Sequence, residues 1–120
     1  MSSYYQIFLR APGEKERFIA DIANAAGCDL KPGAATNGDY DFAGGSDTAK
    51  VQVELSHEFE DDYGIPFSQY PVIITVIDLE RKADREEAYA RSIFRQLAES
   101  GKYSMLLVHD LSDLIDRHDP

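Results

Sequence analysis

The chain has little cysteine and no long apolar run, and each shortage excludes a class of protein. Its single cysteine, Cys28, has no partner within the chain, so the fold cannot depend on an internal disulfide bond. The longest apolar stretch, residues 72–77, is interrupted by Thr75 and is far shorter than the roughly 20 residues of a membrane-spanning helix. The N-terminal residues lack the basic segment and apolar core of a secretory signal. We therefore expect a cytoplasmic protein.

Basic residues are also scarce. The 12 lysines and arginines stand against 22 aspartates and glutamates, which gives a formal net charge of −10. Binding to nucleic acid through phosphates needs lysine and arginine to displace counterions, so this balance argues against a nucleic-acid partner. The same balance argues against an anionic membrane surface.

Motifs that mark an active site are missing as well. There is no Walker loop or dinucleotide-binding glycine motif, and Gly44-Gly45 is only a turn signal. The acidic segments lack the spacing of a calcium-binding loop, and the serines lack a nucleophile elbow. The three histidines, His57, His109 and His118, are scattered, and His57 is expected to be partly buried and hydrogen-bonded. We expect no catalytic residue, no cofactor and no metal site.

The pattern of apolar residues predicts one α+β domain over residues 1–120. A chain of 120 residues is long enough for a core without disulfide bonds or metals. Period-two and helical spacing predict alternating elements. They are a strand at 4–10, a helix at 14–26, strands at 50–59 and 70–79, a helix from 84 to 100, and a strand at 105–109. A short extra strand is expected at 39–43, and a helical turn at 111–115.

This βαββαβ order is typical of a ferredoxin-like fold, an antiparallel sheet with both helices on one face. The expected strand order is 4-1-3-2. Two features of the sequence agree with it. Residues 70–79, expected at the centre, are the most apolar, whereas residues 50–59, expected at an edge, alternate between apolar and charged side chains.

The excess negative charge is confined to three segments. Residues 28–49 hold four acidic groups against one basic group, residues 50–62 hold five against one, and residues 110–120 hold four against one. Both predicted helices lie in segments whose charges balance. In the predicted fold the turn after residue 59 lies at one end of the sheet, and the 28–49 connection and the C-terminal segment lie at the other.

Aromatic residues accompany the acidic ones, and aromatic side chains are common anchors at protein interfaces. An acidic surface also raises the rate of association with a basic partner. We therefore predict a binding surface for a basic protein that includes Asp39, Tyr40, Asp41, Glu54, Glu58, Glu60, Asp61, Asp62 and Tyr63. The reading that the tyrosines are only half-buried loop residues stays open.

In size, acidity and expected architecture the chain resembles the immunity proteins that protect bacteria from toxins. That resemblance implies a stoichiometric inhibitor, or antitoxin, that occludes the active site of a cognate toxin. An alternative is a small ferredoxin-like enzyme, ligand-binding or regulatory domain with a pocket around Arg10, His57 and His109. The chain is expected to be a monomer or a homodimer, and the sequence does not decide which.

Overall fold

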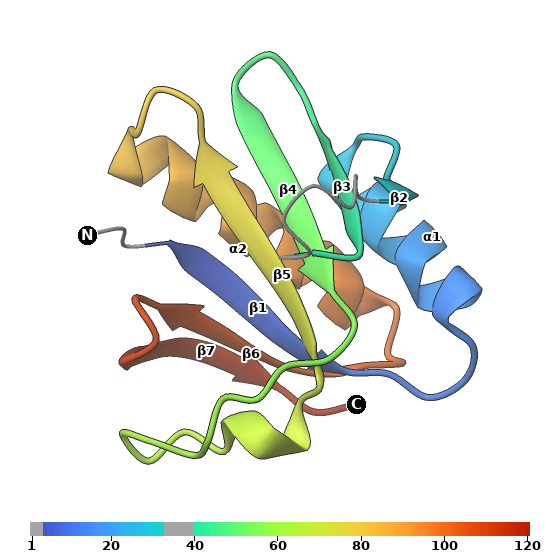
Figure 1. The fold of residues 1–120 in the computed structure, drawn as a ribbon, viewed down its shortest axis with the longest axis vertical. Coiled ribbons are helices and arrows are strands. Elements are labelled where there is room, and N and C mark those ends of the chain that lie inside the picture. The colour runs from blue at the N-terminus through green and yellow to red at the C-terminus, as the bar shows by residue number, and fades with distance from the viewer. Residues whose placement is uncertain (1–3, 33–39) are drawn as a thin grey trace.

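The protein is described by a computed structural model that covers residues 4–32 and 40–120. It is an α+β structure with a seven-stranded antiparallel sheet in the order β2-β3-β4-β5-β1-β6-β7 (Figure 1). The strands are β1 (Tyr5–Arg10), β2 (Lys31–Pro32), β3 (Phe42–Gly45), β4 (Ala49–Glu54), β5 (Val72–Asp78), β6 (Ser104–His109) and β7 (Asp113–His118). The helices are α1 (Lys15–Ala26), α2 (Ala83–Glu99) and the short 3₁₀ helix η1 (Phe67–Gln69).

The sheet is larger than the four-stranded sheet predicted from the sequence. Its four central strands have the expected neighbours, because β1 lies between β5 and β6, and β4 pairs with β5. However, β4 is not an edge strand, since β3 and then β2 continue the sheet beyond it. The extra strand expected at 39–43 is β3, which begins at Phe42; residue 39 lies outside the described residues.

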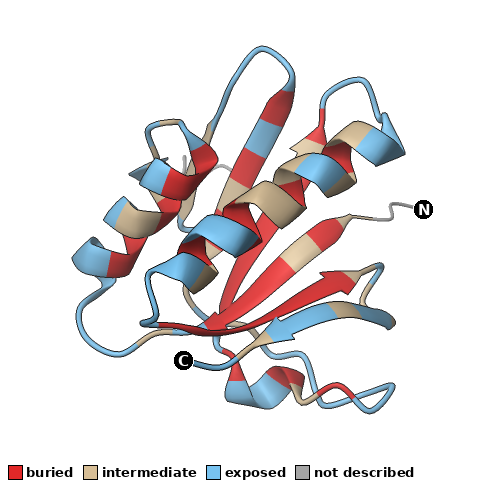
Figure 2. Cartoon of the chain, turned by 180° about the vertical axis from the view of Figure 1, so that it is seen from behind, coloured by how far each residue is buried: buried red, intermediate tan, exposed pale blue. Residues whose placement is uncertain are grey.

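Both helices cover one face of the sheet, as expected (Figures 1 and 2). Helical spacing places Phe18, Ile19 and Ile22 of α1 on its buried side, and Ile93 and Leu97 do the same for α2. These side chains form one core with inward-facing residues of the central strands. Helix α1 ends where Gly27 takes the left-handed conformation (φ 72°), which costs glycine little.

A second apolar cluster, which we call the second core, lies on the face of the sheet opposite the helices. Residues 55–71, which we call the covering segment, run from β4 to β5 across this face (Figure 1). Ile65, Phe67 and Tyr70 of the segment are almost fully buried against Phe8 and Leu106 of the sheet. The sheet is therefore packed on two sides, by helices on one and by an irregular segment on the other.

Two predicted elements are wrong. The strand expected at 50–59 ends at Glu54, because the chain leaves the sheet there and becomes the covering segment. The helical turn expected at 111–115 does not form: Leu111 and Ser112 lie in the turn after β6, and residues 113–115 belong to β7, which forms a hairpin with β6. In the described residues neither helix has the length and apolar composition needed to cross a membrane.

Carboxylates hold the start of α2 to the sheet. Asp78, at the end of β5, accepts hydrogen bonds from the backbone N–H groups of Glu80 and Lys82 and pairs with Arg85 at 2.5 Å. Buried Glu86 accepts hydrogen bonds from the N–H groups of Tyr5 and Asp78, at 3.3 and 2.9 Å. These contacts fix the turn between β5 and α2.

Asp78 gives the fold a defined response to acid. Its hydrogen bond with Arg85, assisted by the N–H groups of Lys82 and Glu80, lowers the pKa of the carboxyl from 3.8 to about 2. A lowered folded-state pKa contributes stability above the unfolded pKa, and that stability is lost as the pH falls from about 4 toward 2. We expect Asp78→Asn to melt below the wild type at pH 7 and the difference to shrink at pH 2.5. Melting curves by circular dichroism test this; an equal difference at both pH values contradicts it.

Candidate protein-interaction site

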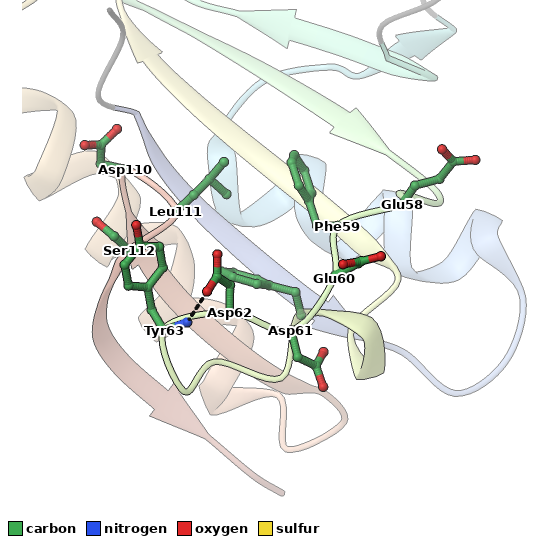
Figure 3. A pocket seen from close by; sticks show the side chains of 10 residues that line it. Glu58, Phe59, Glu60, Asp61, Asp62, Tyr63, Asp110, Leu111 and Ser112 are labelled. Atoms are coloured by element: carbon green, nitrogen blue, oxygen red, sulfur yellow. Dashed lines mark hydrogen bonds between the residues drawn. The ribbon is translucent and has the colours of Figure 1, made fainter.

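An open pocket of about 670 Å³ lies between the covering segment and the β6–β7 turn (Figure 3). We call it the acidic pocket. Two pieces of chain that are distant in sequence form its walls. Its lining residues are Glu58, Phe59, Glu60, Asp61, Asp62, Tyr63, Phe67, Asp110, Leu111 and Ser112.

The pocket carries five carboxylates and no basic side chain. The acidic members are Glu58, Glu60, Asp61, Asp62 and Asp110, all exposed. Within the described part of the chain, none of the ion pairs involves any of them. Hydrogen bonding by the side chain and the backbone N–H of Ser68 lowers the pKa of Asp61, so this carboxylate stays ionised at neutral pH. The result is a concentrated negative charge that a cationic partner can neutralise.

Two aromatic rings stand among these carboxylates. Phe59 is 41% exposed although its ring lies 6.3 Å from that of Phe8 and 6.4 Å from that of Phe67, between centroids. One side of the Phe59 ring is thus held by the second core while the other meets solvent. Tyr63 is 70% exposed at the tip of the covering segment. Large exposed rings beside a charged surface are typical of a protein-binding site.

Tight turns position both walls. Asp62 and Ile65 exchange backbone hydrogen bonds around Tyr63 and Gly64, which have φ angles of 52° and 72°. In the β6–β7 turn, the N–H of Ser112 donates to His109 O, and Asp110 and Leu111 have φ angles of 56° and 59°. Two successive positive φ angles are the geometry of a type I′ turn, which favours asparagine and glycine. Tyr63 and Leu111 are therefore strained.

His57 anchors the covering segment near this pocket. Its Nδ1 accepts a hydrogen bond from the N–H of Phe59 at 3.0 Å, so its Nε2 carries the proton and donates to Tyr70 O at 2.7 Å. The imidazole also lies edge-on to Phe8, with 5.4 Å between ring centroids. This confirms the expectation of a partly buried, hydrogen-bonded histidine. The ring holds together the two ends of the segment that carries the acidic residues.

Five of the nine residues predicted to bind a partner come together in the acidic pocket: Glu58, Glu60, Asp61, Asp62 and Tyr63. The others do not line it. Glu54 ends β4, Tyr40 and Asp41 precede β3, and Asp39 lies outside the described residues. Asp41 has a structural contact, because its Oδ2 accepts a hydrogen bond from the N–H of Leu55 at 2.7 Å.

The sequence-based prediction of the site did not include Phe59, Phe67, Asp110, Leu111 and Ser112. It placed the C-terminal segment at the far end of the sheet from the 58–63 turn, and this is wrong for Asp110, which lines the same pocket. The acidic excess in residues 110–120 was the only signal in the sequence that could have found it. A contact between two loops is not visible in the local pattern of either.

The alternative site around Arg10, His57 and His109 gains no support from the geometry. Arg10 donates to Ser104 Oγ and stacks over the Tyr70 ring, while the His109 ring stacks on Tyr5 at 4.4 Å. None of the three lines the acidic pocket. Across residues 4–32 and 40–120, no three side chains of histidine, cysteine, aspartate or glutamate are grouped as metal ligands.

No protein-family model, curated protein or solved structure matches this chain. The function is therefore inferred from the geometry and charge of the acidic pocket.

The strain at Tyr63 gives a test of whether this position is kept for binding. Asparagine before Gly64 fits a type I′ turn, so we expect Tyr63→Asn to raise the free energy of unfolding by up to about 1 kcal/mol. The same change removes the exposed ring and should weaken partner binding. Urea denaturation measures the first effect, with Tyr63→Ala as the control that removes the ring without favouring positive φ. Equal stability of the two variants contradicts the strain argument.

Proposed function

We propose that this chain is a non-enzymatic binding protein that attaches, one to one, to a basic surface of another protein through the acidic pocket. The supporting observation is the grouping of five carboxylates without a cation around two exposed aromatic rings. By the resemblance in size and charge, we propose a cytoplasmic immunity or antitoxin protein of bacteria, built on a ferredoxin-like unit. Its partner is a toxin domain whose basic active-site surface it occludes.

The charge distribution explains why such a partner suits this pocket. Enzymes that act on polyanions carry a basic substrate channel, and a carboxylate-rich pocket offers the channel the same sign of charge as its substrate. Long-range attraction between the two surfaces steers the encounter and raises the association rate. The rings of Phe59 and Tyr63 then supply apolar contact at the centre of the interface.

The framework of the pocket also favours binding without rearrangement. Its walls are fixed by the His57 hydrogen bonds, the two type I′ turns and the packing of Phe67 and Leu111 against the second core. A preformed surface loses little conformational entropy on association. Tight inhibition of a toxin is favoured by this low entropic cost of binding, because the inhibitor must stay bound.

The test is capture followed by neutralisation. The immobilised chain is exposed to a lysate of the organism that encodes it, and a retained protein is identified by mass spectrometry and then purified. We expect a basic protein that forms a 1:1 complex, is toxic when produced alone and is harmless when produced with the chain. An acidic partner, or toxicity that persists with an equimolar amount of the chain, contradicts the proposal.

A further inference from the structure

A second pocket, of about 290 Å³, lies on the helix side of the sheet, between α2 and the β6–β7 hairpin. We call it the basic pocket. Arg91 and Arg95 of α2 and His118 of β7 line it, over a floor that includes Phe94 and Leu107. Arg117 and a single acidic residue, Asp116, complete the polar lining. A chain with only 12 basic residues thus places three arginines around one small cavity.

His118 has a ring nitrogen that the protein does not satisfy. It pairs across the hairpin with Met105, whose side chain belongs to the helix-side core, so the imidazole lies on the helix side of the sheet. Its Nε2 is buried and, among the described side chains, is the one buried polar atom without a hydrogen-bond partner. A buried polar atom left unpaired is costly, so its position at a pocket wall calls for a ligand.

The two arginines of α2 are also incompletely paired. Arg91 and Arg95 are four residues apart, and like charges at that spacing destabilise a helix. Arg91 uses its Nε in one ion pair, with Glu87 at 2.7 Å. Arg95 has no ion pair or hydrogen bond with any described residue, although it lies beside the pocket. An anion between them would relieve their repulsion.

Arg117 contributes less directly. It pairs across the hairpin with Leu106, which belongs to the opposite face, and its Nε lies 3.4 Å from Asp119. The groups that serve the basic pocket are therefore the guanidinium groups of Arg91 and Arg95, on one wall, and the His118 imidazole, on the other.

We propose that the basic pocket binds the oxyanion of a small phosphorylated or carboxylated molecule. The guanidinium forks of Arg91 and Arg95 match the oxygen geometry of phosphate and carboxylate. The Nε2 of His118, carrying a proton, donates the remaining hydrogen bond from the opposite wall. The cavity is wider than a bare ion needs, and the apolar floor accommodates the body of the molecule. This site is separate from the acidic pocket and does not depend on its partner.

The test is a titration with inorganic phosphate, followed by nuclear magnetic resonance of the His118 ring and the Arg95 Nε–H. Ionic strength is held constant with chloride. We expect saturable shifts at both groups, and Arg95→Gln and His118→Gln should each weaken the apparent affinity about tenfold. Phenyl phosphate and benzoate form two further arms: tighter binding of one identifies phosphate or carboxylate as the preferred group.

Arg17→Gln is the matched control, because Arg17 is exposed on α1 and its loss changes the net charge equally. Its affinity should equal that of the wild type. Equal weakening by Arg17→Gln and Arg95→Gln overturns the proposal, since it shows attraction by overall charge only. Shifts that never saturate, or no shift at His118 with any of the three anions, overturn it as well. Arg95 is exposed, so Arg95→Gln should fold, and its melting curve checks this.

Discussion

Replacing Glu58 and Glu60 by lysine is expected to slow association with the basic partner by about a hundredfold at low salt. Both side chains are exposed and line the acidic pocket. Neither holds the fold through an ion pair in the described structure, so the double variant should melt close to the wild type. The change reverses the local charge and turns attraction into repulsion. Association rates measured by surface plasmon resonance at increasing salt test it.

The matched control is the double variant Asp47→Lys, Glu99→Lys. It changes the net charge by the same amount, and both residues are exposed and lie outside the acidic pocket. At physiological salt its association rate should fall much less than that of the pocket variant, because the Debye length is then about 8 Å and charges farther than this from the interface are largely screened. Equal slowing by the two double variants would mean that the acidity acts as a diffuse field. The acidic pocket would then not be the binding surface.

The larger part of the acidic pocket could be predicted because it is one stretch of sequence. Glu58 to Tyr63 are contiguous, and their charge excess is visible without a structure. The other wall could not be predicted. Leu111 takes a positive φ angle, for which leucine gives no signal, so the turn before β7 was mistaken for the start of a helix.

Elements whose apolar residues recur with a clear period along the sequence were predicted well. Helical spacing of apolar residues predicted a helix at 14–26, which is within one residue of the observed bounds of α1, Lys15–Ala26. The prediction from alternation failed where apolar side chains pack on the other face of the sheet. Alternation continues through His57 and Phe59, but both pack around Phe8 on the face opposite the helices, beyond the end of β4. Alternation does not reveal which face a segment covers.

The start of α2 shows the same limit of local spacing. Asp84 and Glu87 have the spacing of a capping box, yet the helix begins at Ala83 after Lys82, without a side-chain cap. Glu87 instead accepts a hydrogen bond from the Tyr5 hydroxyl and pairs with Arg91. Tertiary partners, which the local spacing cannot show, decided the role of this carboxylate.

Phe67→Ala is expected to lower the free energy of unfolding by about 3–5 kcal/mol. The ring is 2% exposed and lies 4.7 Å from that of Phe8, so the change opens a cavity at the centre of the second core. Phe67 also lines the acidic pocket and fixes the covering segment to the sheet. We therefore expect faster hydrogen exchange in residues 55–71 and weaker partner binding. Urea denaturation and amide exchange measure the two structural effects.

The variant Phe59→Ala distinguishes direct contact with a partner from the packing that holds the covering segment on the sheet. Its ring is 41% exposed, so the variant should lose far less stability than Phe67→Ala and keep slow exchange in the covering segment. Partner binding should nevertheless weaken, because in the proposed interface the ring contacts the partner directly. If Phe59→Ala binds as the wild type does while Phe67→Ala does not, the partner recognises only the carboxylates that the segment holds in place. If neither variant affects binding, the covering segment is not part of the interface, and the acidic pocket is not the binding site.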